Sequence, residues 1–75
     1  MQKMIQLSSI DDVKEFVNNV KELDQPVFVS KEGFAFQLDG ASIMGLMALI
    51  GSKIIVSYEK ATEKFLQLLD RKQVV

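Results

Sequence analysis

The sequence contains neither cysteine nor histidine. Without cysteine, the chain can form no disulfide bond and no thiolate metal site. Without histidine, only carboxylates could bind a metal ion, and their spacing does not match a calcium-binding loop. We therefore expect neither a metal ion nor any other cofactor.

An excess of charge of one sign and a long apolar run are also missing. Nine basic and ten acidic residues are interleaved along the chain, for a formal net charge of −1. The sequence has no basic stripe of the kind that nucleic-acid binding requires, and no apolar run near the roughly 20 residues of a membrane-spanning helix. Residues 1–6 lack the apolar centre of a signal peptide. We expect a cytoplasmic protein that binds neither nucleic acid nor membranes.

The length of 75 residues predicts a single domain over residues 1–75. Domains of this size are near the lower limit for independent folding. Most aliphatic and aromatic side chains must then contribute to the core, because a small domain has little stability to lose. We accordingly expect Tyr58 and the phenylalanines to be core residues.

The clearest helical pattern lies in residues 10–23. Apolar residues recur there at helical spacing, opposite a charged face: Ile10, Val13, Phe16, Val17, Val20 and Leu23. Ser9 and Asp12 have the spacing of a capping box, and acids at Asp11 and Asp12 suit the positive end of a helix dipole. Pro26 disfavours helix in the residue before it, so the segment Asp24-Gln25-Pro26 is predicted to end this helix.

Strand patterns occupy four stretches: residues 2–7, 27–29, 34–38 and 53–58. In the third, Phe34, Phe36 and Leu38 alternate with smaller or polar residues and predict a strand with one apolar face. Residues 30–33 separate the second and third stretches. Gly33 can supply the positive φ of a hairpin turn there, which favours antiparallel pairing.

The carboxyl-terminal part of the sequence predicts a further helix. Thr62 is a candidate N-cap, the apolar side comprises Phe65, Leu66, Leu68 and Leu69, and Arg71 and Lys72 suit the end of the dipole. The order of elements is therefore β-α-β-β-α-β-α. This order predicts an α/β two-layer sandwich (α+β) with the helices on one face of the sheet.

A short apolar helix is predicted over residues 43–50. Ser42 precedes it as a candidate N-cap whose hydroxyl accepts from a first-turn amide. Apolar residues surround this helix without a charge among them, whereas an ordinary surface helix is apolar along one stripe only. We expect Ile43, Leu46 and Ile50 to face the core and Met44 and Met47 to be exposed for a partner. The alternative is that the methionines fill gaps in the core.

The segment Ser-Ile-Met-Gly-Leu-Met at residues 42–47 resembles the Ser-Ile-Met-Gly-Val-Met segment of HPr. HPr is the histidine-containing phosphocarrier of the bacterial sugar phosphotransferase system. The resemblance implies an HPr-like four-stranded antiparallel sheet with three helices on one face. In that family the serine is a regulatory phosphorylation site, and the apolar helix docks partner proteins. The resemblance therefore implies that Ser42 is a candidate phosphorylation site. It also implies a docking role for four residues of the helix: Ile43, Met44, Leu46 and Met47.

The active histidine of HPr lies in a Gly-Ile-His-Ala-Arg-Pro segment at the start of the first helix. An ungapped fit on the shared Ser-Ile-Met-Gly segment brings Asp11 onto the histidine and Val13 onto the arginine. The imidazole and the guanidinium that would hold a phosphoryl group are thus both absent. Ala41 stands where family members commonly carry Lys or Arg. Asp11 is explained as a first-turn capping acid, as a carboxylate that forms an acyl phosphate, or as a residue that imitates a permanently phosphorylated histidine.

The resemblance favours a function in regulation rather than catalysis. Catabolite-repression HPr-like proteins likewise lack the histidine and keep the serine. Our hypothesis is a bacterial, non-catalytic HPr-like protein, related to the phosphoenolpyruvate-dependent sugar phosphotransferase system, that acts through protein–protein interaction. Two alternatives remain open. One is phosphotransfer through Asp11, and the other is a structural homodimer formed by the helix at residues 43–50.

Overall fold

Four strands and three helices follow one another in the predicted order. The computed structural model describes residues 1–74. Its elements are β1 (Gln2–Gln6), α1 (Ile10–Lys21), β2 (Phe28–Lys31), β3 (Leu38–Asp39), α2 (Ile43–Met47), β4 (Lys53–Ser57) and α3 (Glu63–Lys72). None of these helices is long and apolar enough to cross a membrane.

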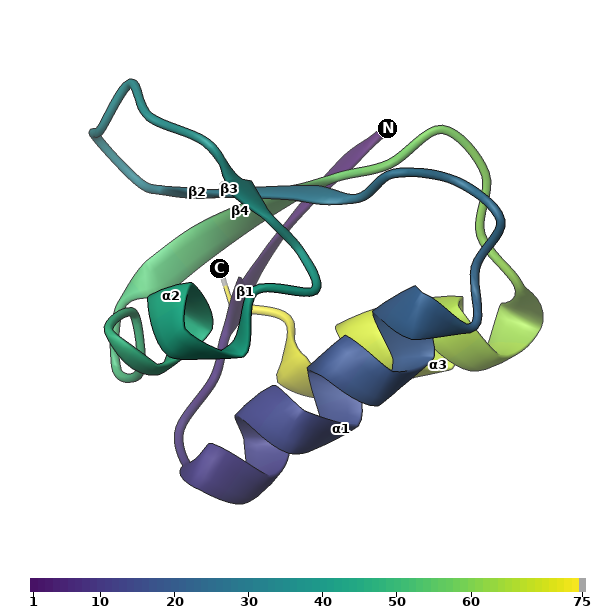
Figure 1. The fold of residues 1–75 in the computed structure, drawn as a ribbon, viewed down its shortest axis with the longest axis horizontal. Coiled ribbons are helices and arrows are strands. Elements are labelled where there is room, and N and C mark those ends of the chain that lie inside the picture. Colours follow the sequence, from purple (N-terminus) through teal and green to yellow (C-terminus); the bar gives the residue numbers. More distant parts are fainter. Residues whose placement is uncertain (75) are drawn as a thin grey trace.

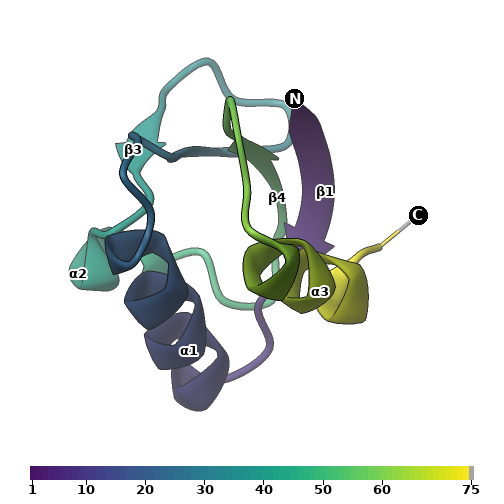
Figure 2. The ribbon, with the colours of Figure 1, turned by 90° about the vertical axis from the view of Figure 1, so that its right-hand side faces the viewer.

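The strands form one antiparallel sheet in the order β1-β4-β2-β3 (Figure 1). Ile54 of β4 lies opposite Ile5 of β1, and Val56 of β4 lies opposite Val29 of β2. All four side chains are fully buried, because the three helices cover this face of the sheet (Figure 2). The predicted two-layer α/β sandwich is confirmed.

Aromatic side chains join the two long helices to the sheet. The ring centroids of Phe16 in α1 and Phe65 in α3 are 6.0 Å apart. Tyr58, directly after β4, meets Phe65 edge-on at 5.9 Å. The rest of the core is aliphatic: Ile5, Leu7, Val13, Val17, Val20, Val27, Val29, Leu46, Leu49, Ile54, Val56, Leu68 and Leu69.

The two long helices begin at the predicted caps. The Ser9 hydroxyl accepts from the Asp12 amide at 3.2 Å, and the Asp12 carboxylate accepts from the Ser8 amide at 2.9 Å. At α3, the Thr62 hydroxyl accepts from the Phe65 amide at 3.2 Å. Ile10 was expected on the core side but is 52% exposed. It is the first residue of α1 and lies ahead of the turn that packs against the core.

The predicted strand over residues 34–38 is largely wrong. β3 begins only at Leu38 and pairs with β2 at two positions. The Phe34 amide donates to the Lys31 carbonyl at 3.0 Å across a turn in which Gly33 has a φ of +86°. The chain after this turn leaves β2 and rejoins it at Leu38, so Phe34 and Phe36 are exposed rather than buried. The expectation that every phenylalanine serves the core is wrong for these two and for Phe28.

Candidate functional site

The short apolar helix α2 ends at Met47, three residues earlier than predicted. Residues 48–51 form turns, in which the amides of Leu49 and Ile50 donate to carbonyls three residues back. The Gly51 amide donates to the Leu7 carbonyl at 2.8 Å, and Gly51 has a φ of +87°. The chain must leave the helix here to enter β4, which shortens α2.

Ser42 precedes α2, but its hydroxyl does not cap the helix. The Asp39 carboxylate instead accepts from the Ala41 amide at 2.8 Å, and the Asp39 carbonyl accepts from the Ser42 amide at 3.0 Å. The predicted hydroxyl cap is therefore wrong, because Asp39 already holds the turn before α2. The Ser42 side chain is partly exposed.

The outer side of α2 is apolar and uncharged. Met44 is 84% exposed, Met47 is 37% exposed and Ile43 is 36% exposed. The exposure of both methionines agrees with the prediction, whereas Ile43 was expected to face the core. Leu46 is fully buried, so its implied docking role is wrong: it anchors the helix and is closed to a partner. We call Ile43, Met44 and Met47 the α2 surface.

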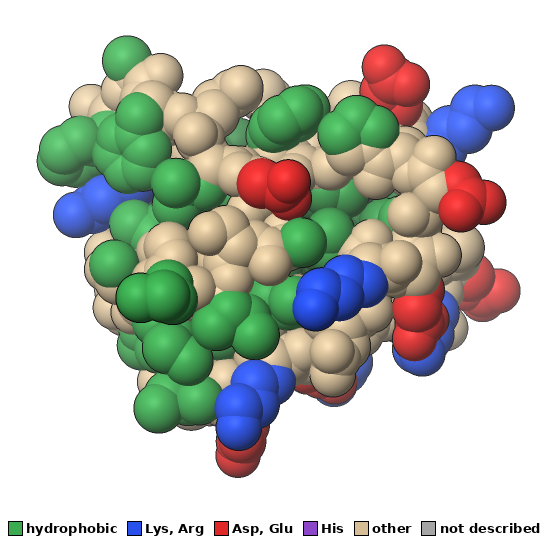
Figure 3. Space-filling model, viewed as in Figure 1, with side chains coloured by type: hydrophobic (Ala, Val, Ile, Leu, Met, Phe, Trp, Pro, Cys, Tyr) green, Lys and Arg blue, Asp and Glu red, His purple; other side chains and the backbone are tan. Residues whose placement is uncertain are grey.

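Close packing against the sheet holds the α2 surface in place. A Cβ atom added at Gly45 would lie 3.0 Å from Cδ1 of Leu38, so the absence of a side chain lets α2 approach β3. The space-filling view shows apolar side chains gathered over α2 and over the loop between β2 and β3 (Figure 3). This side of the molecule is suited to bind an apolar partner surface.

Asp11, which the resemblance to HPr places at the position of the histidine, lies in the first turn of α1 and is exposed. Within residues 1–74 its side chain forms no ion pair. The nearby cations of α3, Arg71 and Lys72, are paired with Asp12 and Glu15. Within residues 1–74, neither of these cations is paired with Asp11.

An ionic cluster joins the end of α3 to the start of α1. Nζ of Lys72 lies 2.8 Å from Oδ1 of Asp12 and 3.2 Å from Oε1 of Glu15. Nη2 of Arg71 lies 3.2 Å from Oε2 of Glu15. The hydrogen bond from Lys72, aided by the Ser8 amide, lowers the pKa of Asp12. The hydrogen bond from Arg71, aided by Lys72, lowers the pKa of Glu15.

Sequence reasoning missed this cluster because its members are some 60 residues apart in the chain. The sequence contains two separate signals, acids in the first turn of one helix and cations in the last turn of another. The dipole of α1 accounts for the acids and the dipole of α3 accounts for the cations. The sequence pattern therefore does not indicate that the acids and the cations are in contact.

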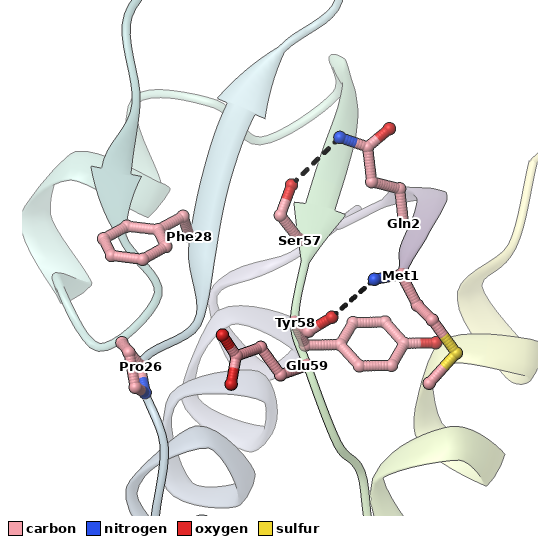
Figure 4. Close-up of a pocket in the computed structure, with 7 residues that line it drawn as sticks. All are labelled: Met1, Gln2, Pro26, Phe28, Ser57, Tyr58 and Glu59. Carbon is pink, nitrogen blue, oxygen red and sulfur yellow. Dashed lines mark hydrogen bonds between the residues drawn. The ribbon is translucent and has the colours of Figure 1, made fainter.

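A cavity of about 230 Å³ lies between β2, the end of β4 and the N-terminus (Figure 4). Two hydrogen bonds join residues of its lining: the Met1 ammonium donates to the Tyr58 carbonyl at 2.7 Å, and the Gln2 amide donates to the Ser57 hydroxyl at 3.3 Å. It presents no nucleophile paired with a base. Within residues 1–74 no group of His, Cys, Asp or Glu side chains is arranged to hold a metal ion.

No protein-family model and no curated protein sequence matches this chain. Its structure is similar to the crystal structure of a phosphocarrier protein HPr from Bacillus anthracis str. Ames, with a TM-score of 0.64 and 26% sequence identity. The similarity covers 97% of this chain and 96% of that one. This similarity, with the observed antiparallel sheet and three helices, shows that the chain has an HPr-like fold over nearly its whole length.

Proposed function

We propose that this chain is a non-catalytic HPr-like protein of a bacterial sugar phosphotransferase system, which regulates by binding a protein partner through the α2 surface. The exposure of Met44, at 84% on a helix without charge, is the observation that carries the proposal. Such side chains reduce solubility unless a partner covers them. Methionine is unbranched and flexible, which suits a surface that must adapt to its partner.

The surroundings of Asp11 support binding without phosphoryl transfer. The sequence contains no histidine, so a phosphoimidazole cannot form. An acyl phosphate on Asp11 would need a cationic donor in addition to the first-turn amides of α1 to hold its charge as strongly as a guanidinium would. Lys72 and Arg71 are instead held by Asp12 and Glu15. Phosphotransfer through Asp11 is therefore the weaker candidate.

Phosphorylation of Ser42 would control this binding. The side chain is partly exposed, its hydroxyl does not cap α2, and it directly precedes Ile43 of the α2 surface. A phosphoryl group would add about 1.5 to 2 negative charges at pH 7. Charge placed beside an apolar docking surface disfavours burial of that surface. We therefore expect Ser42→Asp to weaken partner binding.

A competition assay tests the proposal. An authentic HPr receives its phosphoryl group from phosphoenolpyruvate through the upstream phosphotransferase, and this chain is added as competitor. We expect the chain to slow phosphorylation of the authentic HPr while its own intact mass stays unchanged. The variant Met44→Glu should lose the inhibition. Gln67→Glu, which adds the same charge at an exposed position of α3, should keep it.

Two outcomes would contradict the proposal, and a third would remove one partner from it. An acid-labile adduct of one phosphoryl group on the chain would instead support transfer through Asp11. Equal inhibition by wild type and Met44→Glu would exclude the α2 surface as the docking site. Absence of inhibition by the wild-type chain would exclude the upstream phosphotransferase as its partner.

A further inference from the structure

The methionines are the side chains of this sequence that oxidise most readily. Cysteine, tryptophan and histidine are absent, and the single tyrosine, Tyr58, is only 5% exposed. A mild oxidant converts the thioether of methionine to a polar sulfoxide, and dedicated reductases reverse the change. Which residue of this chain an oxidant modifies therefore depends on which methionine it can reach.

The four methionines differ widely in exposure. Met44 in α2 is 84% exposed and Met1 is 72% exposed, whereas Met47 is 37% exposed. Met4 lies in β1, is only partly exposed and is paired with Ile55 of β4. Met44 and Met1 should therefore oxidise first, because an oxidant in solution has the freest access to their sulfur atoms. Of these two, Met44 belongs to the α2 surface.

Oxidation of Met44 should leave the fold intact. Leu46 anchors α2 and is fully buried, whereas Met44 already faces water. Water can therefore hydrate the new sulfoxide oxygen without entering the core. The effect is confined to the α2 surface, where a polar group that must lose its water on binding costs free energy.

We propose that Met44 is a redox-sensitive modification site, and that its oxidation to the sulfoxide switches off docking through the α2 surface. This regulation rests on the proposed function, because it acts on the same surface. It is separate from phosphorylation of Ser42, since it uses a different residue and requires no kinase.

The switch uses hydrogen peroxide as the oxidant and a dithiol reductase for its reversal. A lone pair of the Met44 sulfur attacks one peroxide oxygen, so that an S–O bond forms and the O–O bond breaks. The sulfur loses two electrons to the peroxide, and the departing hydroxide takes the proton of the transferred oxygen to become water. In the reverse direction the reductase removes the oxygen as water, and its two thiols become a disulfide.

The competition assay with authentic HPr, carried out before and after peroxide treatment, tests this switch. Met44→Leu keeps an apolar side chain of similar volume that peroxide does not oxidise. Met47→Leu makes the same change at the less exposed methionine of α2 and is the matched control. Intact mass counts the oxygen atoms added, and peptide mass mapping assigns them to residues. Circular dichroism follows the fold of the treated chains.

We expect Met44 to oxidise at least about twofold faster than Met47, in line with their exposed fractions of 84% and 37%. Treatment should raise the concentration for half inhibition by about tenfold or more for wild type and Met47→Leu. The treated Met44→Leu chain should inhibit as well as the untreated one, although its Met1 is oxidised. A methionine sulfoxide reductase should restore inhibition by the wild type.

Inhibition by the wild type that survives complete oxidation of Met44 would overturn the switch alone. So would a loss of inhibition in treated Met44→Leu, because another methionine would then be responsible. Unfolding of the treated wild type would also contradict the switch, since its effect would not be confined to the α2 surface. Failure of the untreated wild type to inhibit would overturn the switch together with docking to the upstream phosphotransferase.

Discussion

Asp11 and Asp12 are adjacent acids in the first turn of α1, yet the structure gives them different surroundings. Asp12 accepts from the Ser8 amide and pairs with Lys72, whose side chain is only 10% exposed. Asp11 is exposed and forms no ion pair within residues 1–74. Adjacent residues of one type thus have separate roles, Asp12 in the structure of the helix start and Asp11 at its surface.

Replacing each acid by its amide should separate these roles. Asp11→Asn should lower the free energy of unfolding by about 1 kcal/mol or less, because it removes only an interaction with the helix dipole. Asp12→Asn should cost more, on the order of 1–2 kcal/mol, because it weakens the bonds to the Ser8 amide and to Lys72. Urea unfolding measures both values. A loss of several kcal/mol for Asp11→Asn would mean that Asp11 does not lie free in the first turn.

At the scale of elements, α2 divides its apolar residues between the core and the surface. Leu46 is fully buried, whereas Met44 is 84% exposed only two positions earlier. The helix is therefore anchored by one side chain while its neighbours face outward. Exposed residues of the α2 surface can therefore be substituted without loss of the fold, as long as Leu46 keeps the helix anchored.

Two substitutions in α2 should therefore differ in their effect on stability. Met44→Glu should leave the Tm nearly unchanged, because the side chain is already exposed to water. Leu46→Ala should cost about 2–5 kcal/mol, since it creates a cavity in the core. Thermal unfolding followed by circular dichroism compares the two variants. If Met44→Glu unfolds the protein, Met44 is a core residue and the docking proposal loses its support.

The contact between α1 and α3 should make stability depend on pH. The pKa of Asp12 and the pKa of Glu15 lie below their ordinary values of 3.8 and 4.5 in the folded chain. The unfolded chain then binds protons more readily than the folded chain. The stabilisation is present above these ordinary values and is lost as the pH falls through the depressed folded-state pKa values.

We therefore expect the free energy of unfolding to decline as the pH falls below about 4.5. Lys72→Met removes the cation that Asp12 and Glu15 share, so this variant should show a shallower decline. Chemical unfolding at several pH values measures the effect. Identical pH dependence in wild type and variant would exclude the cluster as its source.

At the scale of the whole molecule, the order and layering of the elements could be predicted from the sequence. Helical spacing and capping residues located α1 and α3, since both features are local. The path of residues 34–37 could not be predicted, because their alternation reports apolar character and not burial. Whether Phe34 is covered depends on where the loop rejoins β2, and that depends on tertiary structure.

The candidate site was predictable to a similar extent. The apolar run without charge located the α2 surface and the exposure of Met44 and Met47. Helical spacing also placed Leu46 on the core side, where it is buried, but it placed Ile43 there too, and Ile43 is 36% exposed, because a short helix that is apolar on all sides does not fix how far its core face extends. The sequence pattern also could not show that Asp39, rather than the Ser42 hydroxyl, holds the turn before α2.

The competition assay with authentic HPr tests the central claim most directly, because it measures docking and phosphoryl transfer together. The account predicts that wild type and Gln67→Glu slow phosphorylation of authentic HPr, that Met44→Glu does not, and that no variant of the chain gains mass. A phosphoryl adduct on the wild-type chain, or inhibition that survives Met44→Glu, would contradict it.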